Sequence, residues 1–328
     1  MERNPDLLYH DELLDRRRRL QEARLTPSAP PEIARLLGQV DAALARWNGG
    51  TFGLCETCGD PVEADRLRCD PLIRFCLDHL DDQERSALER DLDLASKVQA
   101  GLLPKAGIAV DGWEFDFRFE PLGPVGGDYC DVLPPRRPDE GLLFAVGDVS
   151  GKGLAASLVA SHLHALIRTL RDLGGSLQEM IERANRLLCE STLESHYATL
   201  VLGRAFADGR VELCGAAQGP PLLLAGGRVE PLTVAGLPLG MFCSSAYPTR
   251  SVHLAAGDAL VLYSDGVNEA RNPSGDELGV RGLAEALAGV GRGSTSSQIA
   301  RTCIEAADRF RGPAARTDDT TVLVLRKS

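Results

Sequence analysis

The chain lacks any apolar run long enough to cross a membrane, and it has no excess of basic residues. A membrane-spanning helix needs about 20 consecutive apolar residues, and no such run occurs among the 328 residues. The start, Met1 to Asp6, also lacks the apolar core of a signal peptide. We therefore expect a cytoplasmic protein with no membrane partner. The net charge of −11 argues against direct nucleic-acid binding, because nucleic-acid binders are usually basic.

Internal repeats and low-complexity tracts are also missing. Hydrophobic residues make up 44% of the chain and charged residues 25%, which is ordinary for a globular protein and too apolar for a disordered one. A chain of 328 residues is long for one hydrophobic core, so we expect two units.

The first hundred residues are helical in pattern. Asp6–Arg24 predicts a charged amphipathic helix, and a second helix should begin near Pro31 and end at Gly49 and Gly50. Three prolines in residues 26–31 separate the two. The short connection predicts an antiparallel helical hairpin. A further helix is predicted over residues 81–103, before Pro104.

From Ala109 onward, short β-rich stretches mix with a few long helical patterns. The predicted strands include residues 142–146, 198–202, 259–263 and 321–325. The predicted helices are Leu154–Asp172, Leu177–Thr192 and Ser296–Arg311. Because strands and helices do not alternate regularly, the pattern favours an α+β layered domain over a doubly wound one.

Four of the nine cysteines lie between Cys55 and Cys76. Cys55 and Cys58 form a C-x-x-C pair, and Cys76 with His79 forms a second pair at the same spacing. Two such pairs can direct four ligands to one tetrahedral Zn²⁺. A full set of four leaves no position for water, so we expect a structural zinc. Cys69 is a competing ligand, and reduced cysteines without metal are a further alternative.

The other cysteines are scattered along the chain. In a reducing compartment we expect them to be small buried residues rather than disulfide or redox groups. They are Cys130, Cys189, Cys214, Cys243 and Cys303.

The helical hairpin and the Cys-rich segment together resemble the DksA/TraR-type zinc finger over about Asp6 to Leu80. Residues 50–59, Arg66, Leu67, Pro71 and Cys76 carry the likeness. Members of that family can enter RNA polymerase with acidic residues at the hairpin tip. The tip here, residues 26–30, holds no acid. The resemblance makes a transcription regulator acting on RNA polymerase the alternative function, and the tip without acids argues against it.

Four aspartates recur in a shared local setting. Asp128 follows two glycines, Asp148 and Asp265 end apolar stretches, and Asp318 precedes the last apolar stretch. A carboxylate at the junction of a buried strand and a turn can be held rigidly and still face solvent. Mg²⁺ and Mn²⁺ prefer oxygen ligands, and a cation would offset the repulsion between clustered carboxylates. A purely structural scaffold gives no reason for four such acids.

These four segments, in this order, resemble the metal-dependent phosphatases of the PPM class, specifically the bacterial SpoIIE/RsbU branch. Residues 95–104, 197–200 and 236–240 match as well, so the resemblance extends from about Leu94 to Arg326. It implies a β-sandwich with helices on both outer faces. It also implies a protein serine/threonine phosphatase that uses two Mn²⁺ or Mg²⁺ ions.

The resemblance also assigns ligand roles by position. Asp148 would bridge the two ions, Asp128 and the backbone carbonyl of Val149 would hold one, and Asp265 and Asp318 would hold the other. A water activated by both ions would then attack phosphorus, with no covalent phosphoenzyme.

Neighbouring positions carry lesser expectations. Asp131 and Asp319 would support the ligands, and Lys152 is either a phosphate contact or a solvated turn residue. Relatives often carry Asn-Ala-Gly-His before Pro-Pro, whereas Gly219 stands here in place of the histidine. The aspartates are untouched by this departure, so we expect activity to survive it.

The resemblance further implies a partner and a regulatory layout. The substrate would be a phosphorylated STAS-type anti-anti-sigma factor. The zinc unit would act as a sensor or docking module, and the connecting helix would transmit its state, with a homodimer through this helix as one route. The predicted division is a helical hairpin with a zinc finger over residues 1–80, a connecting helix over 81–104 and a phosphatase domain over 105–328.

Overall fold

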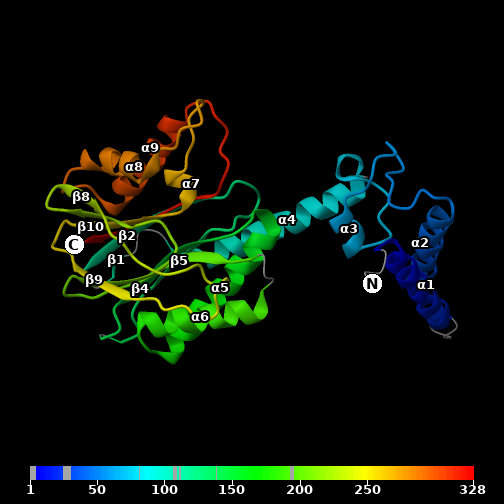
Figure 1. Cartoon of the computed structure of the whole chain (residues 1–328), viewed down its shortest axis with the longest axis horizontal. Coiled ribbons are helices and arrows are strands. Elements are labelled where there is room, and N and C mark those ends of the chain that lie inside the picture. Colours follow the sequence, from blue (N-terminus) through cyan, green and yellow to red (C-terminus); the bar gives the residue numbers. More distant parts are fainter. Residues whose placement is uncertain are drawn as a thin grey trace. The chain divides into compact units, whose positions relative to one another are not determined.

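The computed structural model of the chain describes residues 5–24, 31–80, 82–105, 109–110, 112–137, 139–192 and 196–328. The chain divides into two compact units, Met1–Asp91 and Leu92–Ser328 (Figure 1). The boundary falls inside the helix α4 (Asp82–Leu102). The finer three-part division remains a prediction. Across the described ranges, no helix combines the length and apolarity needed to span a membrane.

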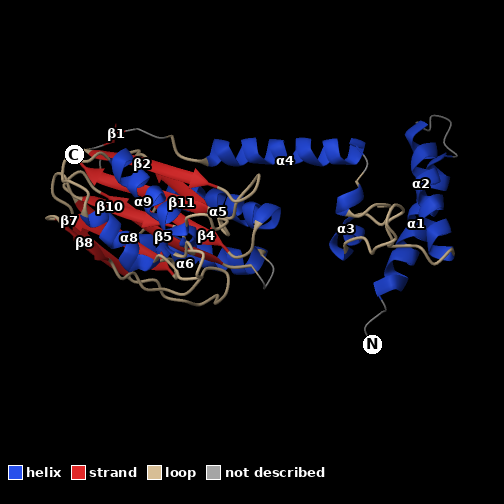
Figure 2. Cartoon of the chain, turned by 90° about the horizontal axis from the view of Figure 1, so that it is seen from above, coloured by secondary structure: helices blue, strands red, loops and turns tan. Residues whose placement is uncertain are grey.

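The first unit is built on the predicted pair of helices, α1 (Pro5–Arg24) and α2 (Pro31–Asn48). They pack along each other (Figure 2). Leu13 of α1 is fully buried against Val40, Ala43 and Leu44 of α2, which follow one another at helical spacing. The hairpin tip, residues 26–30, lies outside the described residues. A short helix α3 (Ala64–Cys69) and a single 3-10 turn, Leu77–His79, follow.

The second unit contains two antiparallel sheets. The six-stranded sheet has the order β1 (Ala109–Val110), β2 (Trp113–Glu120), β11 (Thr320–Lys327), β10 (Ala259–Tyr263), β7 (Leu222–Ala225) and β8 (Arg228–Pro231). The five-stranded sheet has the order β3 (Tyr129–Leu133), β4 (Leu142–Val149), β5 (Ala198–Ala205), β6 (Arg210–Ala216) and β9 (Thr249–His253).

Helices cover the outer face of each sheet. The five-stranded sheet is covered by α5 (Gly153–Leu173) and α6 (Leu177–Ser191). The six-stranded sheet is covered by α8 (Gly279–Ala288) and α9 (Ser296–Arg311) (Figure 2). This arrangement confirms the predicted α+β fold, a β-sandwich with helices on both faces.

The strand β4 shows why the central strands read as unbroken apolar runs. Successive side chains of a strand point to opposite faces of its sheet. Phe144 and Val146 pack between the two sheets, whereas Leu143 and Ala145 pack toward α5 and α6. Both faces are buried, so no polar alternation remains in the sequence.

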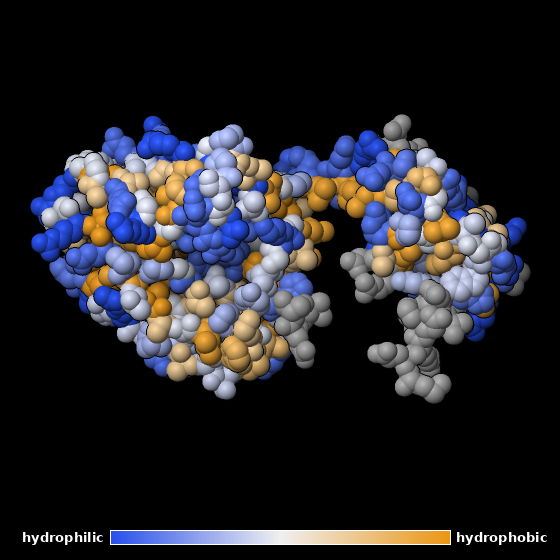
Figure 3. Space-filling model, turned by 45° about the horizontal axis from the view of Figure 1, so that its top comes forward, coloured by the Kyte–Doolittle hydropathy of each residue, from blue (hydrophilic) through white to orange (hydrophobic). Residues whose placement is uncertain are grey.

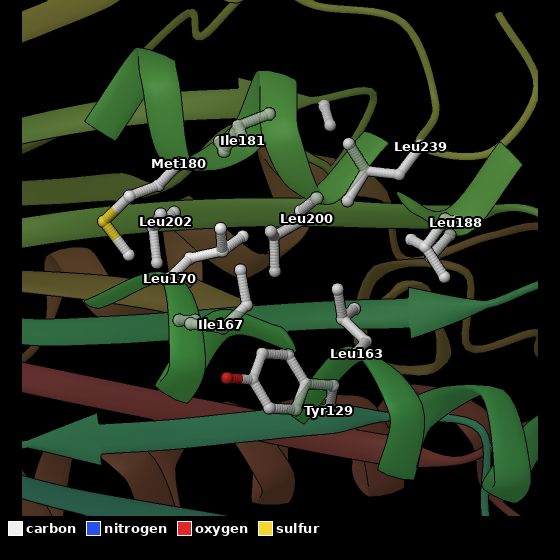
Figure 4. Close-up of a cluster of buried hydrophobic side chains, with 14 of the residues drawn as sticks. Tyr129, Leu163, Ile167, Leu170, Met180, Ile181, Leu188, Leu200, Leu202 and Leu239 are labelled. Atoms are coloured by element: carbon white, nitrogen blue, oxygen red, sulfur yellow. The ribbon is translucent and has the colours of Figure 1, made fainter. Parts of the chain in front are cut away.

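The core beneath α5 and α6 is visible in Figure 4. Leu163 and Ile167 of α5 and Met180 of α6 gather over Leu200 and Leu202 of β5. All are at most 1% exposed. This packing fixes α5 directly after the turn that follows Asp148, and so holds one side of the site described below.

The scattered cysteines follow the prediction only in part. Cys130, Cys214 and Cys303 are buried and unpaired. Cys189 of α6 and Cys243 form a disulfide, with Cα atoms 5.8 Å apart, so the prediction is wrong for these two. The two cysteines are 54 residues apart in the sequence. They meet because the loop of residues 239–245 folds back onto α6, where Asn185 bonds to the backbone of Gly240 and Phe242.

Candidate active site

The topology brings the four predicted aspartates to one edge of the sandwich. In the five-stranded sheet, the pairing of β3 with β4 places the Asp128 turn beside Asp148. In the other sheet, the pairing of β10 with β11 places Asp265 beside Asp318. A hydrogen bond connects the two pairs, because the hydroxyl of Thr321 in β11 donates to Asp128 Oδ2 at 2.5 Å.

The carboxylates influence one another electrostatically. Burial, with the added charges of Asp128, Asp265 and Asp318, raises the pKa of Asp148 to about 9. Burial raises the pKa of Asp128 to about 7. Burial and the Asp318 charge raise the pKa of Asp265 to about 6. In all three cases burial is the largest cause of the raised pKa, and the charges of neighbouring carboxylates add to it.

Two glycines let neighbouring backbone segments pack closely beside the aspartates. A Cβ on Gly127 would lie 3.1 Å from the carbonyl oxygen of Val149, whose own N–H donates to the Gly127 carbonyl at 3.3 Å. A Cβ on Gly266 would overlap the carbonyl oxygen of Asp319. The glycines of the Asp128 and Asp265 motifs therefore allow close packing of the chain around the site.

Hydrogen bonds to the backbone hold the turn that carries Asp128. Asp319 accepts from the Gly127 N–H through Oδ2 and from the Leu122 N–H through Oδ1, both at 2.6 Å. Gln99 of α4 donates to the Gly126 carbonyl at 2.7 Å and accepts from the Gly126 N–H at 3.0 Å. The sequence predicted a supporting role for Asp319, which these contacts describe. It gave no role to Gln99, although this polar residue lies among the matching residues 95–104.

Two further charged groups take different positions. Lys152 donates to Asp318 Oδ2 at 2.8 Å and to the Thr317 carbonyl, so its charge lies at the site. Asp131 instead pairs with Arg168 of α5 through bonds of 2.9 and 3.0 Å. It therefore anchors α5 to β3.

The side chain of Gln218 fixes the loop that contains Gly219. The side chain of Gln218 contacts the Thr199 hydroxyl and donates to the Tyr263 carbonyl at 2.9 Å. These bonds connect the loop to β5 and β10 without using the four aspartates.

The first unit holds a separate and tighter group of potential ligands. In the described part of the chain, one set of three or more such residues brings its donor atoms within 4.8 Å of one another: Cys55, Cys58, Cys76 and His79. The Cys58 and Cys76 sulfurs are 3.8 Å apart, and tetrahedral Zn–S bonds of about 2.3 Å require nearly that separation. The competing Cys69 has a side chain outside the described set.

The two groups suit different metals. Thiolates and an imidazole in a closed tetrahedral set suit Zn²⁺. The wider group of carboxylates, with Asp128 buried and Asp148, Asp265 and Asp318 partly buried, offers the oxygen ligands that hard cations prefer.

Comparisons with known proteins agree with this fold. The family model described as Stage II sporulation protein E (SpoIIE) matches residues 138–328. Phosphoserine phosphatase RsbU of Bacillus subtilis is 25% identical over 191 residues, which cover 57% of this chain and 56% of that protein. Protein IcfG of Synechocystis is 25% identical over 226 residues, which cover 60% of this chain and 35% of that protein. The chain thus spans only about a third to a half of these relatives.

Solved structures share the sandwich. The SiaA-PP2C domain of Pseudomonas aeruginosa superposes with a TM-score of 0.64 at 22% identity, covering 74% of this chain and 98% of that one. The phosphatase domain and regulatory fragment of SpoIIE from Bacillus subtilis superposes with a TM-score of 0.57 at 22% identity, covering 68% and 64%. At these identities the likeness concerns the fold.

Proposed function

Because the chain belongs to the SpoIIE family, whose model matches more than half of it, we propose that it is a metal-dependent phosphatase of phosphoserine or phosphothreonine in proteins. The observation that carries the proposal is the set of four aspartates at one edge of the sandwich, in three of which burial and neighbouring carboxylate charge raise the pKa. The family match begins at residue 138, so the role of Asp128 rests on its position beside Asp148.

We propose the ligand roles that the family resemblance implies, and the placement of the aspartates supports them. Asp148 would contact both cations, because its carboxylate senses the charges of the aspartates on both sheets. Asp128 and the Val149 carbonyl would hold one cation, and Asp265 with Asp318 would hold the other. When bound, two Mn²⁺ or Mg²⁺ ions would acidify a water and offset the charge of the phosphoryl oxygens.

The chain's own residues then position the reactants. Asp319 and Gln99 keep the Asp128 turn in place through backbone hydrogen bonds. Lys152, whose pKa is raised by its bond to Asp318, keeps a positive charge where a phosphoryl group would approach. Reaction needs no nucleophile from the protein, in accord with the burial of the unpaired cysteines in this unit.

The test is release of phosphate from a phosphoserine protein by the purified chain with Mn²⁺. We expect Asp148→Asn and Asp265→Asn to lower kcat/KM by roughly 100-fold or more, since removing even an outer partner of a ligand costs 10–100-fold. Asp139→Asn, with a side chain 80% exposed, should match wild type. Full activity in the first two variants would refute the assignment.

For the first unit we propose one structural Zn²⁺ on Cys55, Cys58, Cys76 and His79 within a zinc finger over residues 1–80. Metal analysis should find one zinc per chain. Cys76→Ser should lose it and unfold this unit, seen as a lost far-UV helical signal. A fully folded zinc-free protein would contradict the proposal, because binding energy of this kind normally stabilises so small a segment.

The substrate and regulation are proposed from the family and from α4. A cytoplasmic STAS-type anti-anti-sigma phosphoprotein is the substrate we propose from the resemblance to the SpoIIE/RsbU branch, and the name of one relative, phosphoserine phosphatase RsbU, supports phosphoserine as the group removed. The connecting helix, residues 81–104, would pass the state of the zinc unit to the Asp128 turn through Gln99. Leu94 and Val98, one turn apart on α4, are 62% and 57% exposed, and Figure 3 shows apolar side chains along this helix.

That exposed stripe supports a homodimer through α4, because one apolar face is best covered by an identical one. Sedimentation should show a dimer for wild type and a monomer for the Leu94→Glu, Val98→Glu double variant. Arg90→Glu, a change on the same helix, serves as the charge control. Wild-type monomers at micromolar concentration would exclude this route.

A further inference from the structure

A cavity of about 250 Å³ adjoins the proposed metal site. Its walls are the segment that begins with α7 (Asp265–Asn268) and the segment between α9 and β11 (Figure 1). Asp265 and Asp318 belong to these walls, so an occupant would lie next to the reacting phosphoryl group. The volume is below the roughly 300–1,000 Å³ of sites for drug-sized ligands, and it suits one or two side chains.

A buried guanidinium faces this cavity. Arg311, at the end of α9, lines it and is only 9% exposed. A guanidinium carries five N–H donors, and among the described residues Arg311 makes one hydrogen bond, to Asp308. The remaining donors are left for an occupant. Carboxylates and phosphates are the groups that pair with arginine in the strongest, two-bond geometry.

The other charged groups of the wall add to this preference. Arg271 donates to Glu277 through one nitrogen at 2.7 Å and is otherwise open to solvent, with a side chain 60% exposed. Arg316 is more engaged, with Glu120 and the Pro121 carbonyl. Each of these three arginines is paired with an acid outside the wall, so the preference for an anion rests on the unused N–H donors of Arg311 and Arg271 rather than on an excess of positive charge.

We propose that this cavity binds an acidic side chain of the substrate, located within a few residues of the phosphorylated serine or threonine. Its carboxylate would pair with Arg311 and Arg271. The inference rests on the proposed phosphatase function, because only that function puts a phosphorylated chain beside Asp265 and Asp318. Free phosphate, the reaction product, shares the anionic chemistry, and the test separates the two.

The experiment compares two phosphoserine peptides that differ in charge alone. One carries glutamate at the two positions on each side of the phosphoserine, and the other carries glutamine there. The kcat/KM ratio of the two peptides is measured with Mn²⁺ for wild type, Arg271→Ala and Arg271→Glu. Arg281→Ala is the matched control, because Arg281 is an exposed arginine of α8 paired with Glu285. Fluorescence anisotropy of the labelled, dephosphorylated peptides measures their binding affinity independently of catalysis.

We expect wild type and Arg281→Ala to prefer the glutamate peptide about 10-fold, the scale of one charge-assisted hydrogen bond. The ratio should fall toward one in Arg271→Ala and below one in Arg271→Glu. Arg311→Lys, which keeps the charge but not the two-bond geometry, should lower the ratio while its melting temperature confirms folding.

Three results would overturn the proposal. Equal rates and equal binding for both peptides in wild type would remove the subsite. A wild-type ratio in Arg271→Ala, together with weaker inhibition by inorganic phosphate, would assign the cavity to product instead. Failure to hydrolyse either peptide or p-nitrophenyl phosphate would refute the phosphatase function itself, and with it the subsite.

Discussion

The buried aspartates predict that one substitution in the site will stabilise the metal-free protein. Asp128 is 3% exposed, and burial raises its pKa from 3.8 to about 7. A folded-state pKa above the unfolded value means that the folded protein binds the proton more tightly, so stability is lost as the pH rises from about 4 to about 7. At about 1.36 kcal/mol per pH unit, the full penalty above pH 7 is about 4 kcal/mol.

Asp128→Asn removes this penalty and keeps an oxygen for the Thr321 hydroxyl. In buffer freed of Mn²⁺ and Mg²⁺, we expect the variant at pH 8 to be about 2–4 kcal/mol more stable than wild type. For a unit of this size the midpoint of thermal unfolding should rise by about 5–10 °C. Differential scanning calorimetry of the transition of residues 92–328 measures this, and the gain should disappear near pH 4.

Two controls complete the experiment. Asp139→Asn removes an exposed carboxylate and should leave the midpoint unchanged. Added Mn²⁺ should raise the midpoint of wild type, because a ligand that binds only the folded state stabilises it, and should raise that of Asp128→Asn much less. An Asp128→Asn protein no more stable than wild type at pH 8 would refute the reasoning that the carboxylate is uncompensated.

Three other substitutions test how the site is held. Gln99→Ala removes both bonds to Gly126 and should raise the Mn²⁺ concentration for half-maximal activity by about 10-fold, whereas Gln178→Ala on exposed α6 surface should not. Arg168→Met removes the two-bond partner of the buried Asp131 carboxylate and leaves it His164 at 3.6 Å and the Val132 N–H, so it should lower the free energy of unfolding by about 1–3 kcal/mol, measured by urea denaturation. Gly266→Ala should cost over about 2 kcal/mol in the same assay and lose activity, because its Cβ has no room.

Sequence patterns predicted the strands that are buried on both faces and the helices that bury one apolar face. The strands β4, β10 and β11 are buried on both faces and read as apolar runs. The helices α5, α6 and α9 were placed within one or two residues. β2 was not predicted, although W-E-F-D-F-R-F-E alternates along its length, and α8 was missed as well. Strands of four residues or fewer, such as β7 and β8, give too short a pattern to recognise.

The same difference applies to the site, where some features depend on neighbouring residues in the sequence and others on residues far apart in it. Each aspartate motif is local, a carboxylate beside a turn, and so is visible in the sequence. The contacts that organise these motifs are not local. Gln99 reaches Gly126 across 27 residues and Asp319 reaches Gly127 across 192. The sequence around Gln99 or Asp319 does not indicate which residue each one contacts, because these contacts depend on the tertiary structure.

The balance of forces at the Asp128 turn indicates why α4 is suited to control the site. Burial of the charged Asp128 carboxylate opposes this arrangement by the roughly 4 kcal/mol worked out above. What holds the turn is a small set of hydrogen bonds, each with a net contribution of about 1 kcal/mol. Gln99 supplies two of them from α4. Displacing this helix would therefore remove about 2 kcal/mol from the assembled turn, enough to change cation affinity by roughly 30-fold. If α4 regulates the site as proposed, a movement of this helix that breaks the Gln99 bonds would act on the Asp128 turn without any rearrangement of the sandwich.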